Sequence, residues 1–77
     1  MSSEFSAAVI RGGFIELCSL LKLENLAASG GEAKQMISAG MVRVNGELET
    51  RKRKKILVGD LVECNGRQVR AVAQESA

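Results

Sequence analysis

Apolar residues first recur at helical spacing near the start of the chain. The positions i, i+3, i+4 and i+7 lie on one face of a helix, and they are occupied by Phe14, Leu17, Cys18 and Leu21. This run predicts a first helix over about residues 14–24 with a buried apolar face, followed by a short connector at 25–28.

A second helical segment has a defined start and end. Ser29 is followed three residues later by Glu32, the spacing of the capping box, in which each side chain accepts a hydrogen bond from a free amide at the helix end. Gly40 suits the other end, because glycine adopts the left-handed backbone conformation at little cost. We therefore predict a helix between Ser29 and Gly40, with a buried face formed by Ala33, Met36 and Ile37.

After this helix the pattern changes to alternation. Val42 and Val44 point to one side of an extended strand and Arg43 to the other, and Asn45–Gly46 follows directly. Asn-Gly between alternating runs is a strong hairpin signal, because a type I′ turn needs positive φ at both central residues. The segment predicts a strand that ends in a hairpin turn.

The same hairpin signal recurs near the end of the chain. Asn65–Gly66 separates the extended runs 61–64 and 68–72, and Gly59–Asp60 is a further turn. Two helices followed by strands joined through hairpin turns predict an α+β fold, with the helices packed on a small antiparallel sheet.

The length of 77 residues predicts a single domain over residues 1–77, with a core from about 14 to 73. Apolar residues make up 45% of the chain, but only two of them are phenylalanines and none is tryptophan or tyrosine. Aliphatic side chains and methionine must therefore fill the core. The ends at 1–3 and 74–77 are expected to fray.

The two cysteines, Cys18 and Cys64, are expected to be free thiols. They are far apart, and the chain has no Cys-x-x-Cys motif and no histidine, which excludes the common zinc spacings. A disulfide between them is the alternative, but Cys18 falls on the buried stripe of the first predicted helix. The chain lacks a signal-peptide pattern and an apolar run long enough to span a membrane, so we expect a cytoplasmic protein without membrane contact.

Positive charge is concentrated in one segment, here named the basic loop: Arg51, Lys52, Arg53, Lys54 and Lys55. The net charge is +2, yet residues 1–50 carry four basic and six acidic side chains, and residues 56–77 carry two and three. The whole positive excess lies in the basic loop, which predicts a local site for anions such as phosphates. Two other interpretations stay open: solvated charges that guard the apolar run 56–58, and a nuclear-localisation signal.

Catalysis is not expected. Without histidine, neither cysteine has a base to activate it. Glu47 and Glu49 share one face of a strand, but beside five cations such acids balance charge rather than act as an acid/base pair. We therefore predict a non-enzymatic binding protein with no cofactor, no metal and no small-molecule substrate.

The kind of nucleic acid is predicted from the lack of aromatic residues near the basic loop in the sequence. Domains that read single strands stack bases on aromatic side chains, whereas no aromatic residue stands near the basic loop in the sequence. This absence favours recognition of the backbone and shape of structured RNA. Gly30 and Gly31, at the first turn of the second helix, offer free amides as a further anion contact, with a tight turn between helices as the equal alternative.

Taken together, these features resemble the RNA-binding domain of ribosomal small-subunit protein S-four, which contains the αL motif. The resemblance covers Ile15–Cys64, two-thirds of the chain. It rests on the order and spacing of Ser29, Ala33, Lys34, Ile37, Gly40, Val42, Val44, Asn45–Gly46, the basic loop and Gly59–Val62. With nothing appended to the domain, the chain is most similar to the small stand-alone bacterial members of the family.

The family implies structured RNA, often ribosomal or transfer RNA, bound across the second helix and the adjoining loop. Carried over by position, Lys34 and the basic loop are the implied contacts, and Arg43, Gly30 and Gly31 complete the candidate RNA-binding residues. Gly30 stands where the family usually carries arginine, and Phe14–Glu16 lacks the usual basic start of the first helix, so the basic loop is expected to contribute more.

Two rival functions stay open alongside RNA binding. In the first, the chain is a protein-interaction module whose basic loop docks on an acidic partner surface. In the second, it is an accessory subunit that lends RNA affinity to a separate enzyme. In each case we expect the chain itself to be a monomer.

Overall fold

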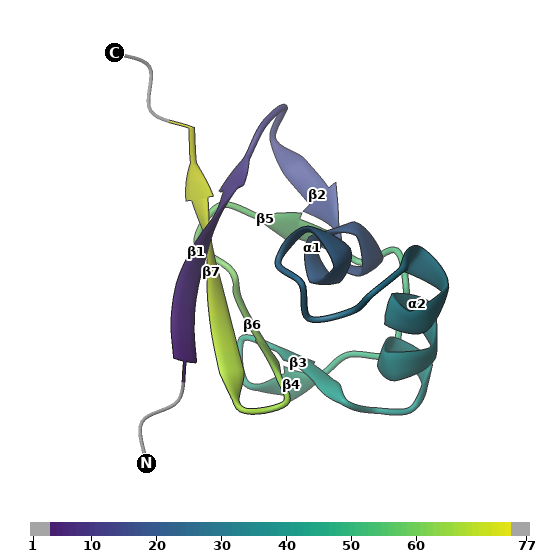
Figure 1. The fold of residues 1–77 in the computed structure, drawn as a ribbon. Coiled ribbons are helices and arrows are strands. Elements are labelled where there is room, and N and C mark those ends of the chain that lie inside the picture. The colour runs from purple at the N-terminus through teal and green to yellow at the C-terminus, as the bar shows by residue number, and fades with distance from the viewer. Residues whose placement is uncertain (1–3, 75–77) are drawn as a thin grey trace.

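The computed structural model describes residues 4–74, which form two sheets and two helices (Figure 1). The larger sheet has five strands in the order β1-β7-β6-β3-β4, and a smaller sheet pairs β2 with β5. In chain order the elements are β1 (Glu4–Ile10), β2 (Phe14–Glu16), α1 (Leu17–Leu23), α2 (Gly30–Ser38), β3 (Val42–Val44), β4 (Glu47–Leu48), β5 (Lys55–Leu57), β6 (Leu61–Cys64) and β7 (Arg67–Ala73). Figure 1 shows both helices on the same side of the larger sheet. The expected α+β class is confirmed.

The core lies between the helices and the inner face of the larger sheet. Its side chains are all apolar, and no polar side chain is buried within the described part of the chain. The predicted alternation is confirmed on β3, where Val42 and Val44 are buried while Arg43 is exposed. The largest fully buried side chains are Leu17, Leu20, Leu21, Ile37, Ile56, Val42, Val62 and Val69.

The first helix begins later than its apolar spacing predicted. Phe14–Glu16 forms β2, which pairs antiparallel with β5, and α1 starts only at Leu17. Leu17, Cys18 and Leu21 lie on the buried face as predicted, but Phe14 is 43% exposed. The prediction was wrong at this end because the strand partner lies far along the chain, where local periodicity carries no information about it.

Helix α1 ends in a Schellman motif with an asparagine in the left-handed conformation. Asn25 has φ +60, its N–H donates to the Lys22 carbonyl at 3.2 Å, and the Leu26 N–H donates to the Leu21 carbonyl at 2.9 Å. Leu26 is buried beyond the helix end. The predicted connector at 25–28 is therefore a packed turn.

Helix α2 has the predicted caps. The Ser29 hydroxyl accepts from the Glu32 N–H at 3.1 Å, and the Glu32 carboxylate accepts from the Ala28 N–H at 3.2 Å, one residue before the amide that a standard capping box uses. At the other end Gly40 has φ +80, and the Met41 N–H donates to the Met36 carbonyl at 3.1 Å. The helix is thus fixed at both ends by signals that the sequence carries.

Both predicted hairpin turns are present. Asn45 and Gly46 have φ of +53 and +83, and Asn65 and Gly66 have +54 and +77, the positive values that a type I′ turn requires. Gly59, in the third predicted turn, has φ +98.

The Asn45 side chain joins two of these turns. Its Nδ2 donates to Asp60 Oδ1 at 3.1 Å, and its Oδ1 accepts from the Leu61 N–H at 2.9 Å. The other Asp60 oxygen accepts from the Leu57 N–H at 2.9 Å. The β3–β4 hairpin is thereby tied to the turn that leads from β5 into β6.

Strand β1 was not predicted, and it changes both the sheet and the core. It pairs parallel with β7 along its whole length, so the larger sheet is mixed rather than antiparallel. Ala8 and Ile10 are buried in the core, which therefore begins before the predicted residue 14. The predicted fraying at 1–3 and 74–77 concerns, apart from Gln74, residues outside the described part of the chain.

Candidate nucleic-acid interface

The basic loop runs from β4 to β5 and is held to the first turn of α1 by main-chain bonds. The Leu17 N–H donates to the Lys54 carbonyl at 2.8 Å, and the Cys18 N–H donates to the Lys52 carbonyl at 3.1 Å. Helix α1 has no side-chain cap at its start, so the loop carbonyls bond amides that would otherwise be free. These two bonds fix the path of the loop without using its side chains.

Four cationic residues of the basic loop line one shallow hollow. It has a volume of about 400 Å³ and is lined by Arg51, Arg53, Lys54 and Lys55. Lys54 is half-buried, and the other members of the basic loop are exposed. Several cations held around one solvent-accessible hollow form a site suited to phosphate groups.

Glu49 holds one of these cations in place. Its carboxylate accepts from the Arg51 guanidinium in a two-point pair, Nε to Oε2 at 3.0 Å and Nη2 to Oε1 at 3.1 Å, and from the Arg51 backbone N–H at 3.0 Å. These hydrogen bonds lower the pKa of Glu49 from 4.5 to about 2. The interpretation of Glu49 as charge balance beside the basic loop is confirmed.

The Glu49–Arg51 pair predicts a specific response to acid. Since the pKa of Glu49 is lower in the folded chain, its ionised form favours folding; that stabilisation is complete above about pH 4.5 and is lost as the pH falls toward 2. We expect Glu49→Gln to be less stable than the wild type at pH 7, by the small amount typical of surface pairs, and equal to it near pH 2. Urea denaturation at both pH values measures the difference, and Glu47→Gln serves as the control. A difference that is constant with pH would contradict the assignment.

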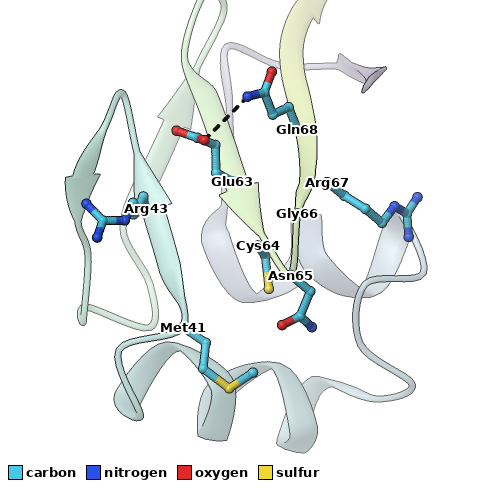
Figure 2. A pocket seen from close by; sticks show the side chains of 8 residues that line it. All are labelled: Met41, Arg43, Glu63, Cys64, Asn65, Gly66, Arg67 and Gln68. Atoms are coloured by element: carbon cyan, nitrogen blue, oxygen red, sulfur yellow. Dashed lines mark hydrogen bonds between the residues drawn. The ribbon is translucent and has the colours of Figure 1, made fainter. Parts of the chain in front are cut away.

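Arg43 lies in a different hollow from the basic loop (Figure 2). Figure 2 shows it on the outward side of β3, across from the Glu63–Gln68 hydrogen bond of 3.4 Å. This hollow has a volume of about 250 Å³ and also includes Met41 and the β6–β7 turn. The two hollows have no lining residue in common. The structure therefore does not bring Arg43 together with the cations of the basic loop.

The helix-side candidates all lie on α2. Gly30 and Gly31 are its first two residues, and Lys34 is half-buried one turn further on. A Cβ at Gly30 would meet no other atom within 4 Å, so the space around this position does not by itself require glycine. None of the three lines the hollow of the basic loop.

Sequence reasoning missed an aromatic residue at the edge of the basic loop. The pairing of β2 with β5 brings Phe14 beside Lys55, whose Nζ lies 5.0 Å from the ring centroid. The expectation that no aromatic side chain stands near the basic loop was therefore wrong. The two residues are far apart in the chain, and only the strand pairing brings them together.

Within residues 4–74 the structure contains neither a disulfide nor a cluster of metal ligands. Cys18 and Cys64 are buried free thiols, as predicted, and burial raises the pKa of Cys64. Residues 4–74 contain no group of three or more side chains suited to hold a metal ion. No helix in the same range is long and apolar enough to cross a membrane.

The fold and the basic loop agree with a known family. The S4 domain family matches residues 8–72, nearly the whole of the described chain. The chain therefore belongs to the S4 domain family, as the resemblance in the sequence suggested.

Individual relatives come from bacteria. The chain is 51% identical to YbcJ of Escherichia coli (strain K12) over 59 residues, which cover 77% of this chain and 84% of YbcJ. The solution structure of YbcJ, described as revealing an αL motif involved in RNA-binding, matches with a TM-score of 0.66 and 41% identity over 95% of this chain and 91% of that one. A second relative, named "Probable ribosome maturation protein RlbA", is from Bacillus subtilis (strain 168). It is 44% identical over 52 residues, which cover 68% of this chain and 73% of the relative.

Proposed function

We propose that this protein binds structured RNA by holding backbone phosphates in the hollow of the basic loop, without catalysing a reaction. The observation that carries the proposal is that four cationic residues line one hollow, on a loop whose backbone is bonded to α1. The RNA-binding motif described for YbcJ supports the same function. Arginine can contact a phosphate through two nitrogens at once, while lysine adds point charge.

The RNA in this proposal is ribosomal or transfer RNA, and the name of the Bacillus subtilis relative favours ribosomal RNA. Lys34 and the first turn of α2 extend the contact on the helix side, and Arg43 adds a separate cation on the sheet. The protein acts in the cytoplasm as a monomer, with no cofactor or small-molecule substrate.

Salt dependence of RNA binding tests this proposal. If about four to six phosphates are contacted, log affinity for ribosomal RNA should fall against log salt with a slope of roughly −3 to −5. Arg53→Gln should weaken binding about tenfold at 0.1 M salt and flatten the slope by about one unit, because one phosphate contact is lost. The matched control is Lys22→Gln, which removes an exposed lysine near the end of α1, outside the basic loop.

Three outcomes would count against the proposal. A slope near zero would exclude backbone contacts, and equal effects of Arg53→Gln and Lys22→Gln would show that only the overall charge matters. Absence of binding to ribosomal and transfer RNA at moderate salt would favour docking on an acidic protein surface instead. Lys34→Gln and Arg43→Gln, measured in the same way, show which of these two residues contacts RNA.

A further inference from the structure

Phe14 is a large apolar side chain that the fold leaves at the surface. It lies on the outward face of β2, directly opposite Leu57 of β5, and 43% of its surface is exposed. The Lys55 Nζ lies 5.0 Å from the centroid of the ring, a cation–π contact. The only other aromatic residue of the sequence is Phe5.

The ring forms one wall of an apolar groove, here named the Phe14 groove. The groove has a volume of about 620 Å³ and lies between β1, β2 and the end of α1. Its lining is Ala7, Val9, Ile10, Arg11, Phe14, Ile15, Leu23 and Glu24. Lys55 does not line the groove, although its Nζ lies over the Phe14 ring. The space and the apolar lining suit a flat aromatic ligand.

Lys55 connects the Phe14 groove with the hollow of the basic loop. It lines the cation hollow, and its Nζ lies over the ring of Phe14, which lines the groove. Arg11 adds a second exposed cation at the groove, while the Glu24 carboxylate accepts from the Ser6 hydroxyl at 3.3 Å. A ligand that reaches from the cations onto the ring must carry negative charge next to an aromatic surface. A nucleotide has this combination, whereas an apolar peptide does not.

We propose that the Phe14 groove receives an unpaired nucleobase of the RNA whose backbone is bound by the basic loop. This inference rests on the function proposed above and narrows its substrate class to structured RNA with a bulged or looped-out nucleotide beside a helical segment. A base inside a continuous RNA helix is stacked on both sides and cannot present its face to a protein ring, but an unpaired base can. Stacking on Phe14 then adds a contact to a base, whereas the basic loop alone contacts only the phosphate backbone of the RNA.

A tryptophan reporter tests the inference directly. The chain has no tryptophan, so Phe14→Trp places a single indole in the groove, and stacking of a base quenches its fluorescence. The probes are two synthetic RNA hairpins with the same stem, one fully paired and one with a single bulged adenosine. We expect quenching by the bulged hairpin only. The matched control is Val58→Trp, at a position of similar exposure (52%) that lines neither the groove, nor the cation hollow, nor the hollow of Arg43, and neither hairpin should quench it.

Affinities of the same hairpins give a second measurement. The wild type should bind the bulged hairpin about tenfold more tightly than the paired one, the low end for stacking one base. Phe14→Ala should bind both hairpins equally, at the affinity of the wild type for the paired one and with an unchanged salt slope. Arg53→Gln should weaken both hairpins by the same factor.

The outcomes separate this inference from the proposed function. Salt-dependent binding of both hairpins with equal affinity, or with a preference that survives in Phe14→Ala, would overturn the base site and leave phosphate binding intact. An indole at position 14 that the bound bulged hairpin does not quench would have the same meaning. Failure to bind either hairpin or ribosomal RNA would overturn the proposed function as well.

Discussion

Replacing Ile56 with alanine should lower the free energy of unfolding by about 2–5 kcal/mol. Ile56 is the central residue of β5 and has no exposed surface, so truncation removes apolar contacts and leaves a cavity. Domains of this size are stable by roughly 4–12 kcal/mol in total. One substitution would therefore remove a large share of the stability. It would also weaken β5, the strand that positions Lys55 at the end of the basic loop.

The neighbouring residue provides a matched control for Ile56. Leu57 stands on the same strand but is 51% exposed, so Leu57→Ala should change the stability by no more than about 0.5 kcal/mol. Urea denaturation of both variants, followed by circular dichroism, measures the two changes. Equal losses would mean that β5 is held by its backbone pairing with β2 and not by its buried side chain.

Gly46→Val should destabilise the protein by about 1–3 kcal/mol. Gly46 has φ +83, a conformation that a β-branched side chain rarely adopts. A Cβ placed there would meet no other atom within 4 Å, so the expected loss comes from backbone strain and not from a clash. The preceding residue, Asn45, ties this turn to Asp60 and Leu61, and the disturbance should reach the turn before β6.

Gly30→Ala is the control for this glycine effect. Gly30 also lies in open space, but its φ is not positive, so alanine should be neutral or should stabilise by about 0.4–1 kcal/mol. Thermal denaturation of both variants separates strain from the general effect of replacing glycine. A Gly46→Val protein as stable as the wild type would show that the turn relaxes without cost.

The features predicted correctly from the sequence all depend on residues a few positions apart. The N-terminal cap of α2 is formed by residues within four positions of one another, and the hairpin turns require only the conformations of Asn45–Gly46 and Asn65–Gly66. These conformational preferences belong to the residues themselves, so they can be recognised before the tertiary structure is known.

The features missed by sequence reasoning depend on partners far along the chain. β1 is a strand because it pairs parallel with β7, from the opposite end of the chain. Phe14 has the spacing of the α1 stripe, yet it lies on a strand because β5 bonds to it. Parallel and long-range pairs leave no local turn signal, and periodicity alone cannot separate a short strand from the start of a helix.

The candidate site likewise has one feature that could be predicted from the sequence and others that could not. The charge run made the basic loop predictable, because five adjacent cations are visible without a structure. The proximity of Phe14 to Lys55 was not predictable, since it follows from the register of β2 and β5. Arg43 was grouped with the loop by charge alone, and the strand geometry places it in a separate hollow.

The main-chain attachment of the basic loop to α1 has a consequence for how such a domain can diverge. The Lys52 and Lys54 carbonyls that hold the loop are present whatever side chains stand at these positions. Substitutions there can change the number and placement of cations while the path of the backbone stays the same. Mutations in the basic loop can therefore change which ligand the domain prefers without changing its ability to fold.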